Sequence, residues 1–328
     1  MSHRDPHDAR ESVCHLGASV AAGPASAATP AGRLDSTAPL LFVLLWSSSF
    51  LGTRIGLRHM SPLWFVALRM ILAAAIMAVA MTALRRPLFR GSGSLSRVAW
   101  MHCAVVGVST QAVLLMTAHV AMTRTEAAPI ALIQTLNPLL SALLAWPLLG
   151  ERLRIAQVLG LLLGFAGVLL ILGLKAMNSR AEVPGLLATI GGVCALSGGT
   201  LYFRRFCRDI PPLPAATAQF IASAVACTGS AVLLESFWTD WHPGAFAGIA
   251  WNTVAVSIGG MALYFLMLTR GTAARATVNF YLVPGVTSLL TWAVLGEQLT
   301  LVMVIGLAIS SFGCWLVGRR PGMTRRMP

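Results

Sequence analysis

The sequence predicts an all-α integral membrane protein of ten transmembrane helices, arranged as two inverted repeats of five helices each. Three observations lead to this prediction: a low content of charged residues, long apolar runs, and an internal sequence repeat. Only 11% of the 328 residues are charged, whereas an ordinary soluble domain carries about 25%. The apolar runs approach or exceed the roughly 18 to 20 residues that a helix needs to cross a bilayer core. The composition therefore places the chain in a membrane.

Ten candidate helices follow from the hydropathy between charged, proline and glycine interruptions. In the first half they are Pro39 to Leu57, Pro62 to Leu84, Val98 to Val120, Ala127 to Leu149 and Ile155 to Leu174. In the second half they are Val183 to Phe203, Ala215 to Glu235, Phe246 to Leu268, Ala273 to Leu295 and Leu301 to Gly318. The joins between them are mostly short, so consecutive helices are expected to be antiparallel neighbours.

The two ends of the chain differ from the rest. Residues 1–38 are rich in Ala, Ser, Gly, Pro and His and contain no apolar run long enough for a signal peptide, which predicts a disordered cytoplasmic tail. Residues 319–328 form a short basic tail, also predicted to be cytoplasmic. Between the tails, residues 39–174 and 183–318 are the two predicted five-helix repeats.

The basic residues predict the orientation in a bacterial-type inner membrane. Of the 24 Lys and Arg residues, 18 lie in the tails and joins on the side of the N-terminus, and Arg69 lies within a span. The opposite side holds only Arg54, Arg58, Arg124, Lys175 and Arg180. By the positive-inside rule both termini are cytoplasmic. Because the net charge of +13 is dispersed over short segments, it gives no reason to expect a nucleic-acid partner.

Shifting the chain by 146 residues reveals an internal repeat. The shift aligns Leu149-Gly150-Glu151 with Leu295-Gly296-Glu297, Pro138 with Pro284, Trp146 with Trp292, Thr123-Arg124 with Thr269-Arg270, and Gly160 and Gly167 with Gly306 and Gly313. Since each half holds an odd number of helices, the second copy must enter the membrane upside down. Inverted repeats are typical of secondary transporters, whose two halves can exchange packings around a shared site.

The duplicated pattern Pro-x(11)-Gly-Glu-x-Leu, together with Trp46-Ser47 in the first span and Pro62 followed by Arg69 in the second, resembles the EamA family of the drug/metabolite transporter superfamily. The resemblance covers about Pro39 to Gly318. It implies export or uptake of small metabolites such as amino acids, and a central cavity lined by spans 1, 3, 4, 6, 8 and 9. Many relatives have Trp-Gly where this chain has Trp46-Ser47.

Arg69 is the one charge expected inside a span. It lies about seven residues into the second helix, roughly 10 Å deep, where a guanidinium is costly unless it is paired or hydrated. Arg69 either anchors a substrate carboxylate or forms a structural bridge to carbonyls or to the interface. Gln219 occupies the equivalent place in the seventh span at an offset of 150, and this favours the structural role.

The candidate cavity residues are polar or aromatic side chains on the spans that the resemblance places at the centre. They are Trp46, Ser109, Gln111, Gln134, Asn137, Tyr264, Asn279 and Tyr281. Pro138 and Pro284 are predicted to kink the fourth and ninth spans and so free backbone carbonyls. Interhelical hydrogen bonding and packing are the alternative role for all of these side chains. Glu151 and Glu297 follow the fourth and ninth spans and are expected to cap helix N-termini.

The sequence favours a transporter over an enzyme. All 11 Asp and Glu residues lie in tails, loops or helix ends, so no buried carboxylate is available for proton coupling, although His102 or His119 could relay protons. No GxSxG, HExxH or CxxC pattern occurs, so no catalytic residue, metal or cofactor is predicted. The alternatives are a membrane-embedded enzyme and a non-transporting sensor. The expected partners are a small-molecule substrate and the bilayer, and both a monomer and a homodimer stay open.

Overall fold

The computed structural model describes residues 33–84, 96–149, 155–178, 181–260, 262–263, 282–298 and 300–318. The chain divides into Met1–Thr37 and a compact unit from Ala38 to Pro328. In the first half the helices are α2 (Arg33–Gly56), α3 (Pro62–Ala83), α4 (Arg97–Gly107), η1 (Val108–Val113), α5 (Leu114–Met122), α6 (Ala127–Gln134), α7 (Asn137–Leu149) and α8 (Ile155–Asn178). In the second half they are α9 (Val183–Phe206), α10 (Pro212–Leu234), α11 (Pro243–Ala250), η2 (Trp251–Gly260), α14 (Val283–Leu295) and α15 (Leu301–Gly318).

Where the structure describes them, the predicted spans are helical, whereas the end of the predicted eighth span and the start of the ninth lie outside the described residues. Helix α2 begins at Arg33, so residues 33–38 are helical and the prediction of a disordered tail up to residue 38 was wrong at its end. Four helical stretches are long and apolar enough to cross a membrane by themselves: Pro62–Ala83, Arg97–Met122, Val183–Phe206 and Pro212–Leu234. Shorter apolar helices accompany them, including Leu40–Gly56 and Val283–Leu295.

The fourth predicted span is interrupted. Helix α6 ends at Gln134 and α7 begins at Asn137, with Thr135 and Leu136 forming a turn between them. Pro138 explains the interruption, because proline has no N–H to donate to the carbonyl of Gln134, four residues earlier, and its ring clashes with that carbonyl. The interruption that the proline predicted is therefore present in α6 and α7.

The third and eighth predicted spans each contain a π-helical segment, η1 and η2. In η1 the hydroxyls of Ser109 and Thr110 donate to the carbonyls of Val105 and Val106, each at 2.8 Å, and such competition for backbone acceptors bends and weakens a helix. Shifted by 146 residues, η1 falls on residues 254–259, which lie inside η2. The two irregular segments thus occupy equivalent places in the two halves, where π-helical turns often mark functional sites.

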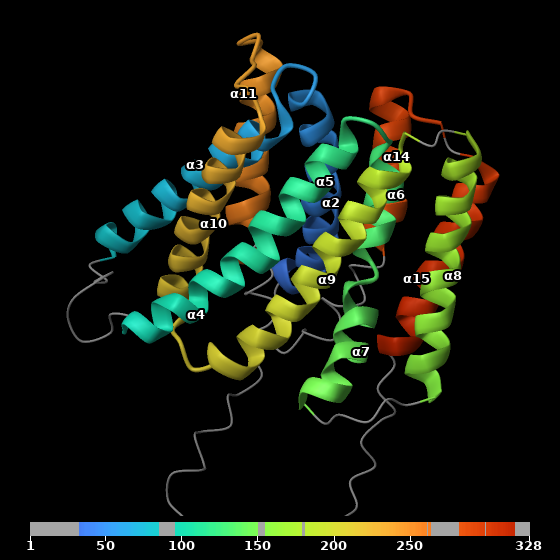
Figure 1. Ribbon diagram of the computed structural model, residues 1–328, viewed down its shortest axis with the longest axis horizontal. Coiled ribbons are helices and arrows are strands. Elements are labelled where there is room, and N and C mark those ends of the chain that lie inside the picture. The colour runs from blue at the N-terminus through green and yellow to red at the C-terminus, as the bar shows by residue number, and fades with distance from the viewer. Residues whose placement is uncertain are drawn as a thin grey trace, which may run out of the picture. The chain divides into compact units, whose positions relative to one another are not determined.

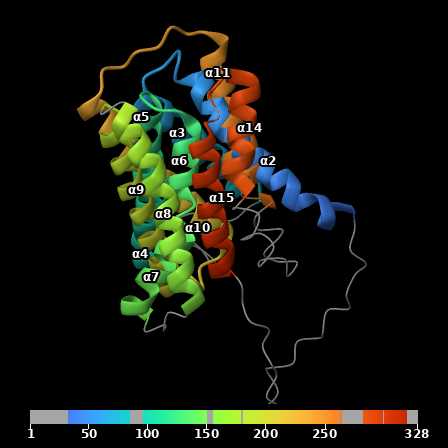
Figure 2. The same cartoon turned by 90° about the vertical axis from the view of Figure 1, so that its right-hand side faces the viewer.

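Pairs of helices from opposite halves pack side by side (Figures 1 and 2), most extensively α8 with α15 and α3 with α10. Small residues bring α8 and α15 together: a Cβ added at Gly167 would lie 2.6 Å from the carbonyl oxygen of Gly306, and one at Gly313 would lie 2.6 Å from that of Gly160. Such close backbone approach is how helices associate in a bilayer. The glycines that repeat in the sequence therefore form the contact between α8 and α15.

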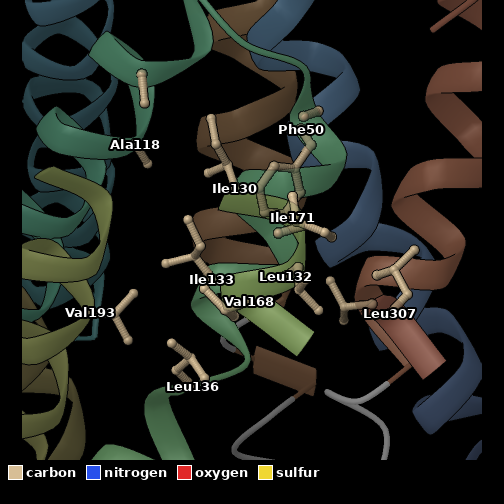
Figure 3. Packing of buried hydrophobic residues seen from close by; sticks show 14 of the residues in the cluster. Phe50, Ala118, Ile130, Leu132, Ile133, Leu136, Val168, Ile171, Val193 and Leu307 are labelled. Carbon is tan, nitrogen blue, oxygen red and sulfur yellow. The ribbon is translucent and has the colours of Figure 1, made fainter. Parts of the chain in front are cut away.

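A central cluster of buried apolar side chains surrounds α6 (Figure 3). It receives Ile130, Leu132 and Ile133 from α6 itself. The surrounding helices α2, α5, α8, α9 and α15 contribute Phe50, Ala118, Val168, Ile171, Val193 and Leu307. Because the fourth span lies among the other helices in this way, its interruption at Thr135 and Leu136 falls inside the bundle.

Candidate functional site

Arg69 reaches from α3 to the π-helical segment η2. Its side chain is 6% exposed. Nε and Nη2 both donate to the hydroxyl of Ser257, at 3.2 and 3.1 Å, and Nη1 donates to Oδ1 of Asn252 at 3.2 Å. Asn252 is held in turn by a bond from Nδ2 to the carbonyl of Gly248 at 3.0 Å. One buried guanidinium therefore ties a span of the first half to an irregular span of the second.

Among the described residues, the oxygen atoms that accept hydrogen bonds from Arg69 are all neutral. In the described part of the chain the ion pairs involve other residues, Arg54 with Glu297 and His59 with Asp240. Residues 264–281, which lie outside the described residues, contain no Asp or Glu in their sequence. In the described part of the chain, the Arg69 guanidinium is therefore buried without a carboxylate partner.

Further polar contacts adjoin this site across α2 and α5. His119 Nδ1 lies 2.7 Å from the carbonyl oxygen of Leu115, and its Nε2 lies 3.3 Å from the hydroxyl of Thr53. Since a carbonyl can only accept, Nδ1 carries the proton and Nε2 accepts from Thr53. Phe65 of α3 packs against the His119 ring with centroids 5.6 Å apart. The histidine is thus fully hydrogen-bonded, as expected of a packing residue.

Helix α2 also contacts the second half directly. Ser47 donates to the carbonyl of Val283 at 3.2 Å, and Ser48 accepts from the indole of Trp251 at 2.9 Å. Trp46 is half-buried, packs against the central apolar cluster, and faces Gly260, where an added Cβ would lie 3.8 Å from its ring. The predicted cavity residue Trp46 therefore lies between α2 and η2, near the same segment as Arg69.

The polar residues of the fourth span lie at its interruption. Asn137 accepts hydrogen bonds at Oδ1 from Ser197 at 2.9 Å and from Ser141 at 3.3 Å. Gln134 is half-buried at the end of α6, and the Thr135 hydroxyl donates to the carbonyl of Leu132 at 2.6 Å. Asn137 thus joins the broken span to α9, another span that the resemblance places at the cavity.

The remaining predicted residues fall into three groups. Ser109 and Gln111 are half-buried in η1, and Ser109 lies against α9, 2.9 Å from a Cβ built at Gly199. Pro284 stands in the first turn of α14, where a missing N–H costs nothing. Four predicted residues lie outside the described residues: Tyr264, Asn279, Tyr281 and Glu151.

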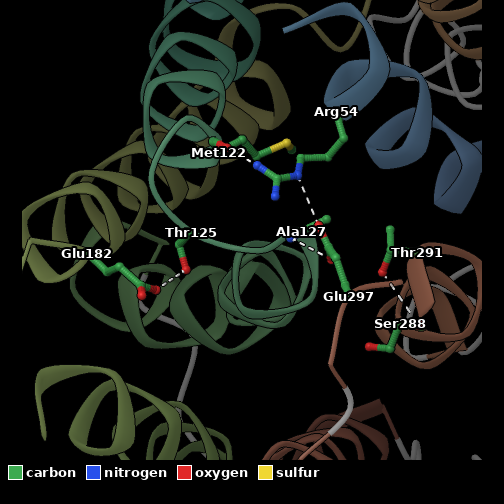
Figure 4. Close-up of polar contacts among 8 residues, drawn as sticks. All are labelled: Arg54, Met122, Thr125, Ala127, Glu182, Ser288, Thr291 and Glu297. Atoms are coloured by element: carbon green, nitrogen blue, oxygen red, sulfur yellow. Dashed lines mark hydrogen bonds and ion pairs between the residues drawn. The ribbon is translucent and has the colours of Figure 1, made fainter. Parts of the chain in front are cut away.

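Glu297 belongs to a polar cluster at the end of the bundle where α2 ends (Figure 4). Arg54 Nε donates to its Oε1 at 2.9 Å, and the backbone N–H of Ala127, at the start of α6, donates to its Oε2 at 3.2 Å. Arg54 also donates to the carbonyl of Met122. Glu297 therefore caps α6 rather than the helix that follows it. We call Arg54, Met122, Ala127 and Glu297 the Arg54 cluster.

Glycine sets the position of Glu297. Gly296 ends α14 with φ of 68°, a left-handed conformation that favours glycine. This turn carries the chain away from α14, and the carboxylate of the next residue then points to α6 (Figure 4). In the second copy of the repeated sequence, Leu295-Gly296-Glu297 is thus a helix stop followed by a cap for another helix.

The sequence-based reasoning missed the partners that complete these sites. Ser257 and Asn252 were not selected, because a serine or asparagine in an apolar run usually has a packing role. The π-helical geometry that places these two residues, five positions apart, on one face leaves no recognisable pattern in the sequence. Arg54 entered the sequence analysis only as one of the basic residues that predict the membrane orientation. An open groove of about 520 Å³ between α14 and α15 is lined almost entirely by apolar side chains and lacks the polar groups that a metabolite site needs.

Among the described residues, no three His, Cys, Asp or Glu side chains converge as metal ligands. The chain matches the EamA-like transporter family twice, over residues 37–173 and 183–319. A solved structure described as "Crystal structure of protein" has a TM-score of 0.59 and 24% identity, covering 87% of this chain and 96% of that one. This likeness shows the fold, and the apolar helices among the described residues agree with the predicted all-α membrane class.

Several relatives are similar in sequence. The chain is 28% identical over 311 residues to the "Probable terminal-alkyne amino-acid exporter" of Streptantibioticus cattleyicolor, covering 88% of this chain and 94% of that protein. It is 23% identical to the "Probable amino-acid metabolite efflux pump" of Escherichia coli, covering 87% and 94%. It spans 57% of the length of "Uncharacterized transporter YvbV" of Bacillus subtilis, at 25% identity. The predicted resemblance is confirmed: the chain belongs to the EamA-like transporter family.

Proposed function

We propose that this chain is a secondary transporter that exports small metabolites, amino acids among them, across the inner membrane by alternating access. The observation that carries the proposal is the family match over both halves of the chain. Two relatives that align over 94% of their length and are named for amino-acid export or efflux support the substrate class. Membership of a transporter family fits a non-enzymatic role, so neither the membrane enzyme nor the sensor is favoured.

The proposed mechanism uses residues 39–174 and 183–318 as inverted repeats. The contact between α8 and α15 supports this. Gly167 and Gly306 approach each other, and their equivalents in the opposite repeat, Gly313 and Gly160, approach each other in the same way. A contact that maps onto itself in this way is what a two-fold relation produces. Two halves related by such an axis can exchange packings and open one site to either side of the membrane.

The Arg54 cluster is proposed to close the outer end of the pathway. With both termini cytoplasmic, the end of α2 lies on the outer side, and there Arg54 and Glu297 link α2, α6 and the end of α14. Export requires such contacts to break when solute leaves outward. The histidine–carboxylate pair of His59 and Asp240 joins the α2–α3 and α10–α11 loops at the same end, with 2.8 Å between Nδ1 and Oδ2.

Counterflow in proteoliposomes tests the proposal. Vesicles holding the full chain are loaded with a panel of amino acids and related metabolites, the labelled counterpart is added outside, and the assay is repeated with a pH gradient. Saturable exchange of any solute is the expected result, and the effect of the gradient shows whether protons are coupled. Failure of folded protein to exchange any member of the panel would contradict the transporter assignment and favour the sensor or enzyme.

A further inference from the structure

Among the described residues, Arg69 is a buried positive charge whose hydrogen-bond partners are all neutral. We propose that the Arg69 guanidinium, positioned by Asn252 and occupied by the Ser257 hydroxyl when no ligand is bound, is the docking site for a carboxylate group of the transported solute. This inference rests on the proposed function and adds the chemical class of the ligand, a carboxylic acid anion, and the side chain that binds it. Three observations support it: the charge balance, the geometry of the guanidinium, and the asymmetry between the halves.

The charge balance requires an anion. A guanidinium held away from water is costly unless an opposite charge accompanies it, and Arg69 is 6% exposed with only neutral oxygen partners among the described residues. All 11 acidic residues of the chain lie in tails, loops or helix ends. The counter-charge must therefore come from outside the protein, and a solute carboxylate supplies it.

The geometry shows where the carboxylate binds. The edge formed by Nε and Nη2 is the edge on which a carboxylate makes two parallel hydrogen bonds. In this structure a single hydroxyl, that of Ser257, accepts from both nitrogens at 3.2 and 3.1 Å, longer than the 2.7 to 2.9 Å of charge-assisted bonds. The Ser257 oxygen thus occupies the position where the two oxygens of a carboxylate would bind. Rotation of the Ser257 side chain would free this edge of the guanidinium for the carboxylate.

Thr253, the residue after Asn252 in η2, carries a buried hydroxyl without a partner among the described residues. Thr253 is 1% exposed, and its Oγ1 has no hydrogen-bond partner within the described residues. Buried hydroxyls are normally paired, because an unmade hydrogen bond costs about 1 to 3 kcal/mol. The π-helical segment that holds Arg69 therefore also carries an unused donor.

The equivalent place in the other half is closed. There Gln219 of α10 stands where Arg69 stands in α3, and its backbone approaches the end of α4 next to η1: a Cβ added at Gly107 would lie 2.4 Å from the Gln219 carbonyl oxygen. The residue equivalent to Gly107 in the second half is Thr253, with its unpaired hydroxyl. Helix α10 therefore packs directly against the end of α4, whereas the Arg69 guanidinium and the Ser257 hydroxyl lie between α3 and η2. This difference gives the protein one carboxylate site rather than two.

Ligand-induced thermal stabilisation of the purified full chain in detergent tests the site without requiring transport. The probes are straight-chain carboxylates from acetate to hexanoate, compared with their primary amides and with chloride at equal ionic strength. We expect the carboxylates to raise Tm and the amides not to. Arg69→Gln should weaken carboxylate binding by about tenfold or more, since hydrogen bonds to charged groups are strong. Arg124→Gln, which removes an exposed arginine, should not.

Ser257→Ala separates this role from a structural bridge. Without the hydroxyl the carboxylate has no competitor, so we expect a lower Tm of the free protein but a larger ligand-induced rise. Loss of stability in both variants, with no carboxylate-specific rise in the wild type, would overturn the inference and leave Arg69 as a bridge. Equal binding of acid and amide would overturn it as well. In either case counterflow by the wild type would leave the transporter assignment intact.

Discussion

Breaking the Arg54–Glu297 ion pair should destabilise the folded protein by a measurable amount. The Glu297 side chain is 9% exposed and that of Arg54 is 29% exposed. Losing one partner of a buried pair costs about 3 to 5 kcal/mol, but Arg54 can turn to water and still bond the carbonyl of Met122. We therefore expect about 2 to 3 kcal/mol for Glu297→Ala, which also removes the cap of α6.

A double-mutant cycle separates the pair from the cap. Arg54→Ala, Glu297→Ala and the double variant are unfolded reversibly in mixed micelles, and the free energies of unfolding are compared. We expect a coupling energy of about 1 to 2 kcal/mol between two residues in contact. Glu297→Gln should cost less than Glu297→Ala, because the amide oxygen can still accept from Ala127.

The matched control is Arg124→Ala combined with Glu297→Ala. Arg124 is an exposed arginine two residues beyond Met122, and its effect should add to that of Glu297→Ala within about 0.5 kcal/mol. Additive effects of Arg54→Ala and Glu297→Ala would refute the reasoning, since the ion pair would then contribute nothing to the free energy of unfolding.

Three further outcomes are expected. Gly107→Ala should lower Tm because its Cβ would meet the backbone of α10 at 2.4 Å, whereas Gly191→Ala, with no atom within 4 Å, should not; equal effects would contradict the close packing. The hydrogen bond from His59 lowers the pKa of Asp240 below its usual value of 3.8. The His59–Asp240 pair therefore stabilises the folded protein above that pH, and this stabilisation is lost as the pH falls below it. Asp240→Asn should remove this part of the acid dependence of Tm. Asn137→Ala should impair counterflow while membrane insertion stays normal; unimpaired counterflow would exclude Asn137 from the pathway.

The predicted spans coincide with the described helices because crossing a bilayer imposes a length and an apolar composition that are visible residue by residue. Pro138 likewise predicted the interruption after Gln134, since the missing N–H and the ring clash are properties of proline itself. The start of α2 at Arg33 was not predicted, because nothing in a polar stretch marks where a helix extends beyond its apolar part.

The sequence by itself determined the membrane class, the helix positions, the repeat and the family, because these depend on composition, local geometry and fixed spacing. Only the tertiary structure decided what the polar residues contact. Arg69 and Ser257 are 188 residues apart, and Arg54 and Glu297 are 243 apart, so no local pattern connects them. Glu297 was expected to cap a helix N-terminus, and only the tertiary structure shows that this helix is α6, which starts 170 residues earlier in the other half of the chain.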